Sequence, residues 1–333
     1  MIVSRAPVRF SLGGGGTDLP GYAERFGGFV VSAAIDKYVY VACNRRFYRD
    51  IRLSYSKTEI VKSVADIEHP IFREALSFMG IVDSIELVSV ADVPANSGLG
   101  SSSAFTVALL GALHSHKGEE VDARQLAHEA CQLEIERLKE PIGRQDQYIA
   151  AVGGVTALTF GRSGSVAVEP VAASRETIRR LEENLLVVYS GVERQARVVL
   201  SEQTRNLRQD DVAVVERMHR IKALGHEVVS LLLAGDVDRY GEILHEHWMS
   251  KRGVAASMTD DTLDRHYEAA RAAGALGGKL MGAGGGGFFL FYVRRADRGR
   301  VEAAMVARGL STLPFTFDFE GARIVLPTVL GST

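Results

Sequence analysis

The segment Pro94-Ala95-Asn96-Ser97-Gly98-Leu99-Gly100-Ser101-Ser102-Ser103-Ala104 decides the fold of this chain. It lies between a strand-like run at residues 85–90 and a helix-like run at residues 105–113. A strand, a loop of small residues and a helix in this order direct several backbone N–H groups at one point, where the helix dipole adds partial positive charge. Glycines allow close backbone approach and serines offer hydroxyl groups. The segment therefore predicts a binding site for an anion, in particular a polyphosphate.

Two familiar motifs do not match this loop. A Walker A loop would carry Lys-Ser or Lys-Thr after its second glycine, and neither pair follows Gly100. The nucleophile elbow of a serine hydrolase needs the frame Gly-x-Ser-x-Gly, which is missing around Ser101 and Ser102. A flexible turn before a serine-capped helix is the remaining alternative, and the other motifs of the chain weigh against it.

Composition narrows the class of protein. The 333 residues are 46% hydrophobic and 24% charged, as in soluble globular proteins, and the length suits two domains. A net charge of −2 predicts no partnership with nucleic acid or with an anionic membrane surface. No apolar run reaches membrane-spanning length, and residues 1–7 lack the core of a signal peptide. We therefore expect a cytoplasmic protein, in which Cys43 and Cys131 form neither a disulfide framework nor a zinc site.

The pattern of predicted secondary structure changes near residues 172–184. Before this point, short β-branched and aromatic runs predict strands at 29–35, 38–43, 51–55 and 85–90, helices at 105–114, 122–138 and 145–152, and a hairpin within 155–171. After it we expect a strand at 185–189, helices from 196 to 273, a strand at 288–293, a helix at 301–308 and strands within 312–326. The prediction is an α+β protein with domains at 1–175 and 176–333 and an active site in the cleft between them.

Two further glycine clusters flank the first. Gly13 to Gly16 follow a strand and precede Thr17 and Asp18, so a ligand could lie against bare backbone while the Asp18 carboxylate accepts hydrogen bonds from a polyol. The alternative is that Asp18 caps the next turn. Residues 282–287 match Gly-x-Gly-x-x-Gly, but a strand follows where a dinucleotide site needs a helix. That loop is expected to close over phosphates or to pack against residues 94–104.

An acidic cluster suits phosphoryl transfer, which needs a carboxylate to hold Mg²⁺ and a group to orient or deprotonate the acceptor hydroxyl. Glu134, Glu136 and Asp146 are the candidates. The two glutamates cannot share one helix face, so only one should point into the site, and a solvated helix face is the alternative for both. Arginines near the glycine and acidic segments could clamp a phosphate bidentately; they are Arg5, Arg9, Arg144 and Arg194.

The three glycine motifs, together with Gly143-Arg144-Gln145-Asp146-Gln147, resemble the GHMP kinase superfamily, which includes galactokinase, homoserine kinase and mevalonate kinase. The similarity extends over essentially the whole chain. Residues 94–104 resemble the family pattern Pro-x-x-x-Gly-Leu-Gly-Ser-Ser-x-Ala with very few departures. Within the superfamily, residues 6–20, 141–148 and 277–288 look like the D-glycero-D-manno-heptose 7-phosphate kinases.

This resemblance implies ATP and Mg²⁺ as cofactors, with Asp146 as the catalytic residue aided by Arg9. Ser102 and Glu136 would hold the metal ion, with Glu134 as the alternative to Glu136. The implied ATP-binding residues are Pro94, Asn96, Ser97, Gly98, Leu99, Gly100, Ser101 and Ser102. The implied substrate-binding residues are Gly15, Gly16, Thr17, Asp18, Arg144, Arg194, Gly284 and Gly285.

The pair Gly15-Gly16 stands where galactokinase has Glu-His, which argues against galactose and leaves room for a larger sugar. A seven-carbon sugar phosphate also needs a cation at its far end, and we expect Arg194 in this role, with Lys251 and Arg144 as alternatives. The resemblance thus implies phosphorylation of the anomeric hydroxyl of D-glycero-D-manno-heptose 7-phosphate to the 1,7-bisphosphate, towards a nucleotide-activated heptose, by a monomer or homodimer. The alternatives are another sugar 1-kinase, for fucose, galactose or a uronic acid, and a non-catalytic sugar and nucleotide sensor.

Overall fold

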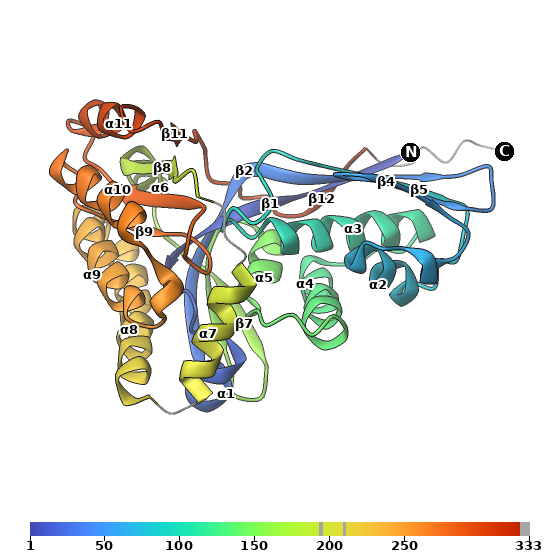
Figure 1. The fold of residues 1–333 in the computed structure, drawn as a ribbon, viewed down its shortest axis with the longest axis horizontal. Coiled ribbons are helices and arrows are strands. Elements are labelled where there is room, and N and C mark those ends of the chain that lie inside the picture. Colours follow the sequence, from blue (N-terminus) through green and yellow to red (C-terminus); the bar gives the residue numbers. More distant parts are fainter. Residues whose placement is uncertain (193–195, 209–210, 327–333) are drawn as a thin grey trace.

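The computed structural model describes residues 1–192, 196–208 and 211–326. Two β-sheets, each covered by helices, occupy the two sides of the molecule, which confirms the α+β class (Figure 1). Within the described residues, no helix is both long and apolar enough to span a membrane. The two sheets and the loops between them are what position the candidate site.

The larger sheet has eight strands among the described residues, in the order β12-β1-β2-β5-β3-β4, with β6 paired to β2 and β7 paired to β6. The strands are β1 (Ile2–Gly13), β2 (Gly28–Arg45), β3 (Ile51–Ser54), β4 (Thr58–Val61), β5 (Ile85–Ala91), β6 (Val155–Phe160), β7 (Val166–Pro170) and β12 (Arg323–Leu326). All pairs are antiparallel except β3 with β5. The two strands predicted at 29–35 and 38–43 are one long strand, β2, which pairs with β6 at its start and with β5 at its end.

Helices cover one face of this sheet (Figure 1). They are α2 (Pro70–Phe78), α3 (Ser101–Lys117), α4 (Ala123–Cys131) and α5 (Gln145–Val152). Helix α3 packs on β1 and β2 and is buried around most of its circumference, as its Ala- and Leu-rich sequence requires. The helix predicted at 122–138 is present, but α4 continues into one π-helical turn, Gln132–Arg137. The extra residue in such a turn changes which side chains point towards α3.

The smaller sheet has the strand order β11-β8-β10-β9 in the described part of the chain. Its strands are β8 (Leu185–Tyr189), β9 (Gly277–Leu280), β10 (Phe288–Tyr292) and β11 (Ser311–Thr312). The helices of the second half are α6 (Arg175–Asn184), α7 (Ala196–Arg208), α8 (Val212–Ala234), α9 (Tyr240–Arg252), α10 (Asp261–Ala272) and α11 (Arg298–Val306). Short helical segments complete the molecule: α1 (Pro20–Phe26) and 3₁₀ turns at Val64–Asp66, Val237–Arg239 and Ala256–Met258.

The chain passes from the larger to the smaller sheet between β7 and β8, near the predicted division at residue 175. The end of the chain then returns to the larger sheet, because β12 pairs with β1 and Phe317 forms a bridge with Ile35. The two halves also touch directly. A Cβ atom on Gly13 would lie 3.0 Å from the Cα atom of Gly225 in α8. The division into 1–175 and 176–333 stays a prediction, and β12 is its structural exception.

Candidate active site

The loop between β5 and α3 is built as an anion cradle. Helix α3 begins at Ser101 after Gly100, whose φ of 75° is left-handed, and no side chain caps the helix. Its first N–H groups therefore stay available to a ligand. Gly98 also has a left-handed φ of 81°, and a Cβ atom there would lie 2.8 Å from the Met281 carbonyl oxygen. Only glycine allows this approach, so residues 97–100 form a compact loop that leads directly to the free N–H groups at the start of α3.

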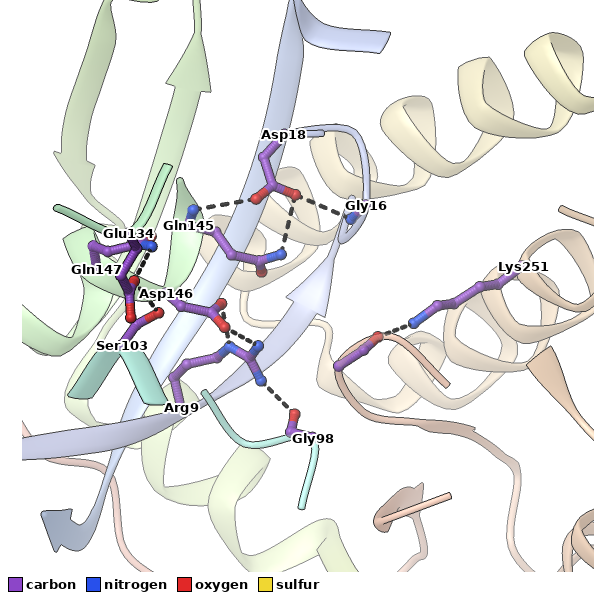
Figure 2. A network of polar contacts seen from close by, with 11 residues as sticks. Arg9, Gly16, Asp18, Gly98, Ser103, Glu134, Gln145, Asp146, Gln147 and Lys251 are labelled. Carbon is purple, nitrogen blue, oxygen red and sulfur yellow. Dashed lines mark hydrogen bonds and ion pairs between the residues drawn. The ribbon is translucent and has the colours of Figure 1, made fainter. Parts of the chain in front are cut away.

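An ion pair lies directly beneath this loop. Arg9 of β1 donates from Nε to Asp146 Oδ1 (2.8 Å) and from Nη2 to Asp146 Oδ2 (2.6 Å), while its Nη1 donates to the Gly98 carbonyl oxygen (2.6 Å) (Figure 2). A Cβ atom on Gly100 would lie 3.1 Å from Asp146 Oδ2, so the loop contacts the pair closely. The predicted partners Arg9 and Asp146 are thus brought together, and Arg9 ties Asp146 to the loop.

Asp18 is held next to this pair. Its Oδ1 accepts hydrogen bonds from Gly16 N (3.2 Å) and Gln145 Nε2 (3.0 Å), and its Oδ2 accepts one from Gln145 N (3.1 Å) (Figure 2). Burial raises the pKa of Asp18, and the Asp146 carboxylate raises it further. A Cβ atom on Gly143 would lie 1.9 Å from Asp18 Oδ2. Glycine at 143 is therefore required for Asp18 to reach the start of α5.

Glu134 lies in the π-helical turn, fully buried against α3. Its carboxylate accepts hydrogen bonds from Ser103 Oγ (2.8 Å) and Gln147 Nε2 (2.5 Å) (Figure 2). It also accepts one from Thr106 Oγ1 (2.8 Å). Burial raises its pKa to about 7, although these hydrogen bonds favour the ionised form. A buried carboxylate at the first turn of α3 is well placed to balance a cation beside bound phosphates.

The prediction that Glu136 holds the metal ion does not fit this geometry. Glu136 is exposed, because a helical step of two residues turns it away from α3 while Glu134 faces inward. Ser102 is exposed at the start of α3, next to the cradle. The structure therefore selects the alternative glutamate, Glu134, as the carboxylate beside the loop.

Two pockets adjoin these groups. One has a volume of about 240 Å³ and combines apolar side chains with the loop; it is lined by Val39, Tyr55, His69, Ile71, Ser89, Ala91, Val93, Ala95, Asn96, Ser101, Ser102 and Phe105. We call it the loop pocket. The second, which we call the acceptor pocket, has a volume of about 70 Å³ and is lined by Arg9, Gly16, Asp18, Leu19, Ile142, Gly143, Gln145, Asp146, Leu200, Gln203, Lys251, Gly282 and Ala283. The two pockets have no lining residue in common, and the loop pocket alone includes residues of the cradle.

Two residues predicted to bind substrate from the first glycine cluster serve the loop itself. Thr17 is fully buried, and its Oγ1 donates within hydrogen-bond range of Gly14 O (2.8 Å) and Phe29 O (2.9 Å) and accepts from Phe29 N (3.0 Å). Its hydroxyl group is therefore saturated by the backbone and does not fit a role in substrate binding. Gly15 packs on Ser11, since a Cβ atom there would lie 2.4 Å from Ser11 Oγ. Gly16 does line the acceptor pocket.

The third glycine loop lies against the first, as one sequence hypothesis expected. Phe288 N donates to Ser97 O (3.2 Å), and a Cβ atom on Gly282 would lie 2.7 Å from Gly98 Cα. The predicted substrate residues Gly284 and Gly285 instead contact Met258: a Cβ atom on Gly284 would lie 2.2 Å from its Sδ, and Gly285 N donates to its carbonyl oxygen (2.8 Å). The glycine at 282, two residues earlier, is the one that reaches the acceptor pocket.

Of the three cations predicted to bind the far end of the substrate, the structure describes two. Arg194 lies outside the described residues. Arg144 lines a separate cavity of about 350 Å³, which meets the acceptor pocket at Asp18, and its guanidinium donates to the Gly164 carbonyl oxygen. Lys251, named as an alternative, lies in the acceptor pocket itself.

The sequence analysis assigned no role to two glutamines that hold carboxylates of the site in place. Gln145 holds Asp18 with two hydrogen bonds, and Gln147 binds Glu134. Both glutamines flank Asp146 in the Gly-x-Gln-Asp-Gln motif, so this motif contained the signal that could have identified them. Gln203 of α7 also lines the acceptor pocket, and no local pattern around it indicates this.

Comparison with known proteins identifies the class. The protein-family model described as GHMP kinases N terminal domain matches residues 59–154, and the family model described as GHMP kinases C terminal matches residues 228–310. Together they match more than half of the chain. The chain belongs to the GHMP kinase family. The predicted superfamily is thereby confirmed.

Particular relatives carry more specific names. A D-glycero-alpha-D-manno-heptose 7-phosphate kinase of Campylobacter jejuni is 28% identical, over 97% of this chain and 98% of its own length. A solved structure of a D-glycero-D-manno-heptose 1-phosphate kinase from Bacteroides thetaiotaomicron matches with a TM-score of 0.81 and 25% identity, covering 98% of this chain and 99% of that one. A bifunctional fucokinase/GDP-fucose pyrophosphorylase of Arabidopsis thaliana is 27% identical over 88% of this chain, but over only 30% of its own length.

Proposed function

We propose that this protein is an ATP- and Mg²⁺-dependent sugar kinase that phosphorylates the anomeric hydroxyl of D-glycero-D-manno-heptose 7-phosphate, with the 1,7-bisphosphate as product. The observation that carries the kinase chemistry is the Arg9–Asp146 pair, because it lies beneath the free N–H groups of the loop and faces the acceptor pocket. A donor phosphate and an acceptor hydroxyl can meet only where these two features adjoin.

The loop pocket is the proposed ATP site. Free N–H groups at the start of α3 would bind the phosphates, and the apolar side chains of the pocket, among them Tyr55 and Phe105, suit a planar base. The glycines at 98 and 100 keep the backbone bare where phosphates would lie. Fixed N–H donors of this kind stabilise the charge that develops on phosphoryl oxygens during transfer.

The residues present fit a magnesium ion held jointly with phosphates. Glu134 is a buried carboxylate that forms no ion pair among the described residues, and Ser102 offers an exposed hydroxyl in the first turn of α3, next to Ser103, which donates to Glu134. Oxygen ligands of this type suit Mg²⁺, which binds to few protein groups when phosphates supply the rest. When bound, the ion would neutralise charge on the phosphates. Ser103, Thr106 and Gln147 would keep the Glu134 carboxylate oriented.

Asp146 is the proposed catalytic residue. Its two hydrogen bonds from Arg9 fix the carboxylate at the acceptor pocket, where it would orient the hydroxyl and accept its proton. Asp18, held by Gln145, would accept hydrogen bonds from other hydroxyls of the sugar. The acceptor pocket is smaller than a sugar phosphate in this structure, so we expect it to widen when the acceptor binds.

The choice of a heptose phosphate rests on the relatives. The names of the Campylobacter and Bacteroides proteins differ in the position of the phosphate, yet both specify a heptose that already carries one. Both similarities extend over nearly the whole chain. Gly16 lines the acceptor pocket, and the space that its missing side chain leaves there could be used by a seven-carbon sugar.

The decisive experiment measures ADP release with MgATP across a panel of acceptors: the heptose 7-phosphate, the heptose 1-phosphate, free heptose, fucose, galactose and mannose. We expect turnover with the heptose 7-phosphate alone, with the product carrying a new anomeric phosphate by ³¹P NMR. Turnover confined to an unphosphorylated sugar such as fucose would replace the proposed substrate. ATP binding without ADP formation from any acceptor would support the sensor hypothesis instead.

A further inference from the structure

Three basic side chains are buried together behind the acceptor pocket. His247 and Lys251 lie four residues apart on α9, with exposed fractions of 1% and 5%, and Lys279 lies on β9, with an exposed fraction of 1%. We call them the basic cluster. Full burial of lysine is rare in proteins unless the charge is paired, so the presence of two such lysines here needs a reason.

Close packing of α9 on β9 brings these residues together. A Cβ atom on Gly277 would lie 1.9 Å from the Gly241 carbonyl oxygen, so the backbones of the strand and the helix touch. Lys251 extends from α9 to the third glycine loop, where its Nζ donates to the Gly282 carbonyl oxygen (2.5 Å) (Figure 2). Its ammonium group thereby reaches the acceptor pocket, on the side opposite Asp146.

The basic cluster has no counter-ion among the described residues. Neither lysine forms an ion pair there, and both ring nitrogens of His247 are buried without a hydrogen-bond partner. Burial and the Arg9 guanidinium lower the pKa of Lys251 to about 8. Burial and the neighbouring Lys251 lower the pKa of Lys279 well below its usual range. Asp18 is the carboxylate that acts on Lys251, and burial raises its own pKa.

We infer that the basic cluster binds a phosphate group that the acceptor already carries, with Lys251 in contact and His247 and Lys279 supporting its charge from behind. The inference rests on the proposed function, in which the acceptor is a sugar phosphate. A phosphate dianion would be the counter-ion that the basic cluster lacks among the described residues, and it would favour the protonated form of the lysines.

The position of Lys251 favours the acceptor over ATP as the source of this phosphate. Lys251 lines the acceptor pocket with Gly16 and Asp18, and it does not line the loop pocket. Arg9, the other buried cation of the acceptor pocket, is already saturated by Asp146 and Gly98. Among the described residues, Lys251 gives only one hydrogen bond, to a carbonyl oxygen, and an ammonium group has three donors.

The test compares Lys251→Met with Lys62→Met, which removes the same charge from an exposed position after β4. Initial rates are measured with the phosphorylated heptose and MgATP as varied substrates. For Lys251→Met we expect a rise of about 10- to 100-fold in KM for the phosphorylated sugar, the effect of losing one hydrogen bond to a charged group. The KM for MgATP should change less than about twofold, and Lys62→Met should match the wild type.

A second measurement needs no turnover. Inorganic phosphate should bind the wild-type protein competitively with the sugar phosphate in titration calorimetry, and Lys251→Met should weaken this binding by a similar factor. Should Lys251→Met fail to fold, Lys279→Met serves as the second variant, with an expected rise of about three- to tenfold in the same KM.

The outcomes separate the two proposals. A wild-type enzyme that does not prefer the phosphorylated sugar overturns the proposed function, and the phosphate site with it. A wild-type preference that survives unchanged in Lys251→Met and Lys279→Met overturns only the phosphate site. An effect confined to the KM for MgATP also overturns it, because the cluster would then serve the nucleotide.

Discussion

The acceptor pocket has charged groups on two sides, and the two sides are built differently. On one side, Arg9 and Asp146 satisfy each other through two hydrogen bonds, and Arg9 also binds Gly98. On the other side, Lys251 and Lys279 are buried without any ion pair in the described structure. A buried ion pair holds its geometry before a ligand arrives, whereas an unpaired buried charge costs free energy until a ligand completes it. The first design suits a catalytic residue and the second suits a binding site.

The largest expected effect comes from the paired side. Asp146→Asn keeps the shape of the side chain and can still accept from Arg9, but it cannot take a proton. We expect kcat to fall by about 10²–10⁴-fold, the usual contribution of a general base, with the Kd for MgATP unchanged. Single-turnover and binding measurements give both values. Nearly normal turnover would show that positioning and electrostatics alone carry the reaction.

Glu134 is the acidic counterpart of the unpaired lysines, and Glu136 provides a matched control. In Glu134→Gln we expect the Kd for Mg²⁺ in the ATP complex to rise by on the order of 10- to 100-fold, because an ionised oxygen ligand is lost. Glu136→Gln removes the same charge two residues away from an exposed position and should behave like the wild type. Equal effects in the two variants, or an effect in Glu136→Gln only, would contradict the assignment of Glu134.

Substitutions on the two sides of the acceptor pocket should change the free energy of unfolding in opposite directions. Arg9→Met leaves Asp146 without its partner and should lower the free energy of unfolding by about 2–4 kcal/mol. Lys279→Met removes an unpaired buried amine of similar length and should raise it by about 1 kcal/mol. Urea unfolding of the ligand-free proteins at neutral pH measures both. The same sign for both variants would mean that the lysines are satisfied in the folded protein after all.

The last prediction is a pH dependence of the free energy of unfolding. Burial lowers the pKa of Lys251 to about 8 in the folded protein, from 10.5 for an ordinary lysine. Between these values the unfolded chain binds more protons, so this residue lets stability rise with pH from about 8 to 10.5. The difference in unfolding free energy between wild type and Lys251→Met should therefore narrow by about 3 kcal/mol across that range. A difference that is flat with pH would mean that Lys251 titrates normally.

Local patterns predicted the elements and the glycine loops well, because their signals lie within a few residues. Helix α5 begins and ends at the predicted residues, and the loop before α3 connects a strand to a helix as expected. The failures came from long-range packing. The π-helical turn that brings Glu134 rather than Glu136 to α3 depends on the fit between two helices. The burial of Lys251 and Lys279 depends on α9 lying against β9, which no spacing in the sequence reveals. Thr17 carries a hydroxyl suited to a ligand, yet the backbone of β2 saturates it.

The backbone contact between the loops at Gly98 and Gly282 links the two substrates to one another. Each loop leaves no room for even a methyl group on the other, so a shift of one loop towards its ligand moves its neighbour. We therefore expect nucleotide and acceptor to bind cooperatively, and this coupling must be reciprocal: whatever factor ATP contributes to acceptor affinity, the acceptor contributes to ATP affinity. An inhibitor that binds in only one of the two pockets would thus change the affinity of the other pocket for its ligand.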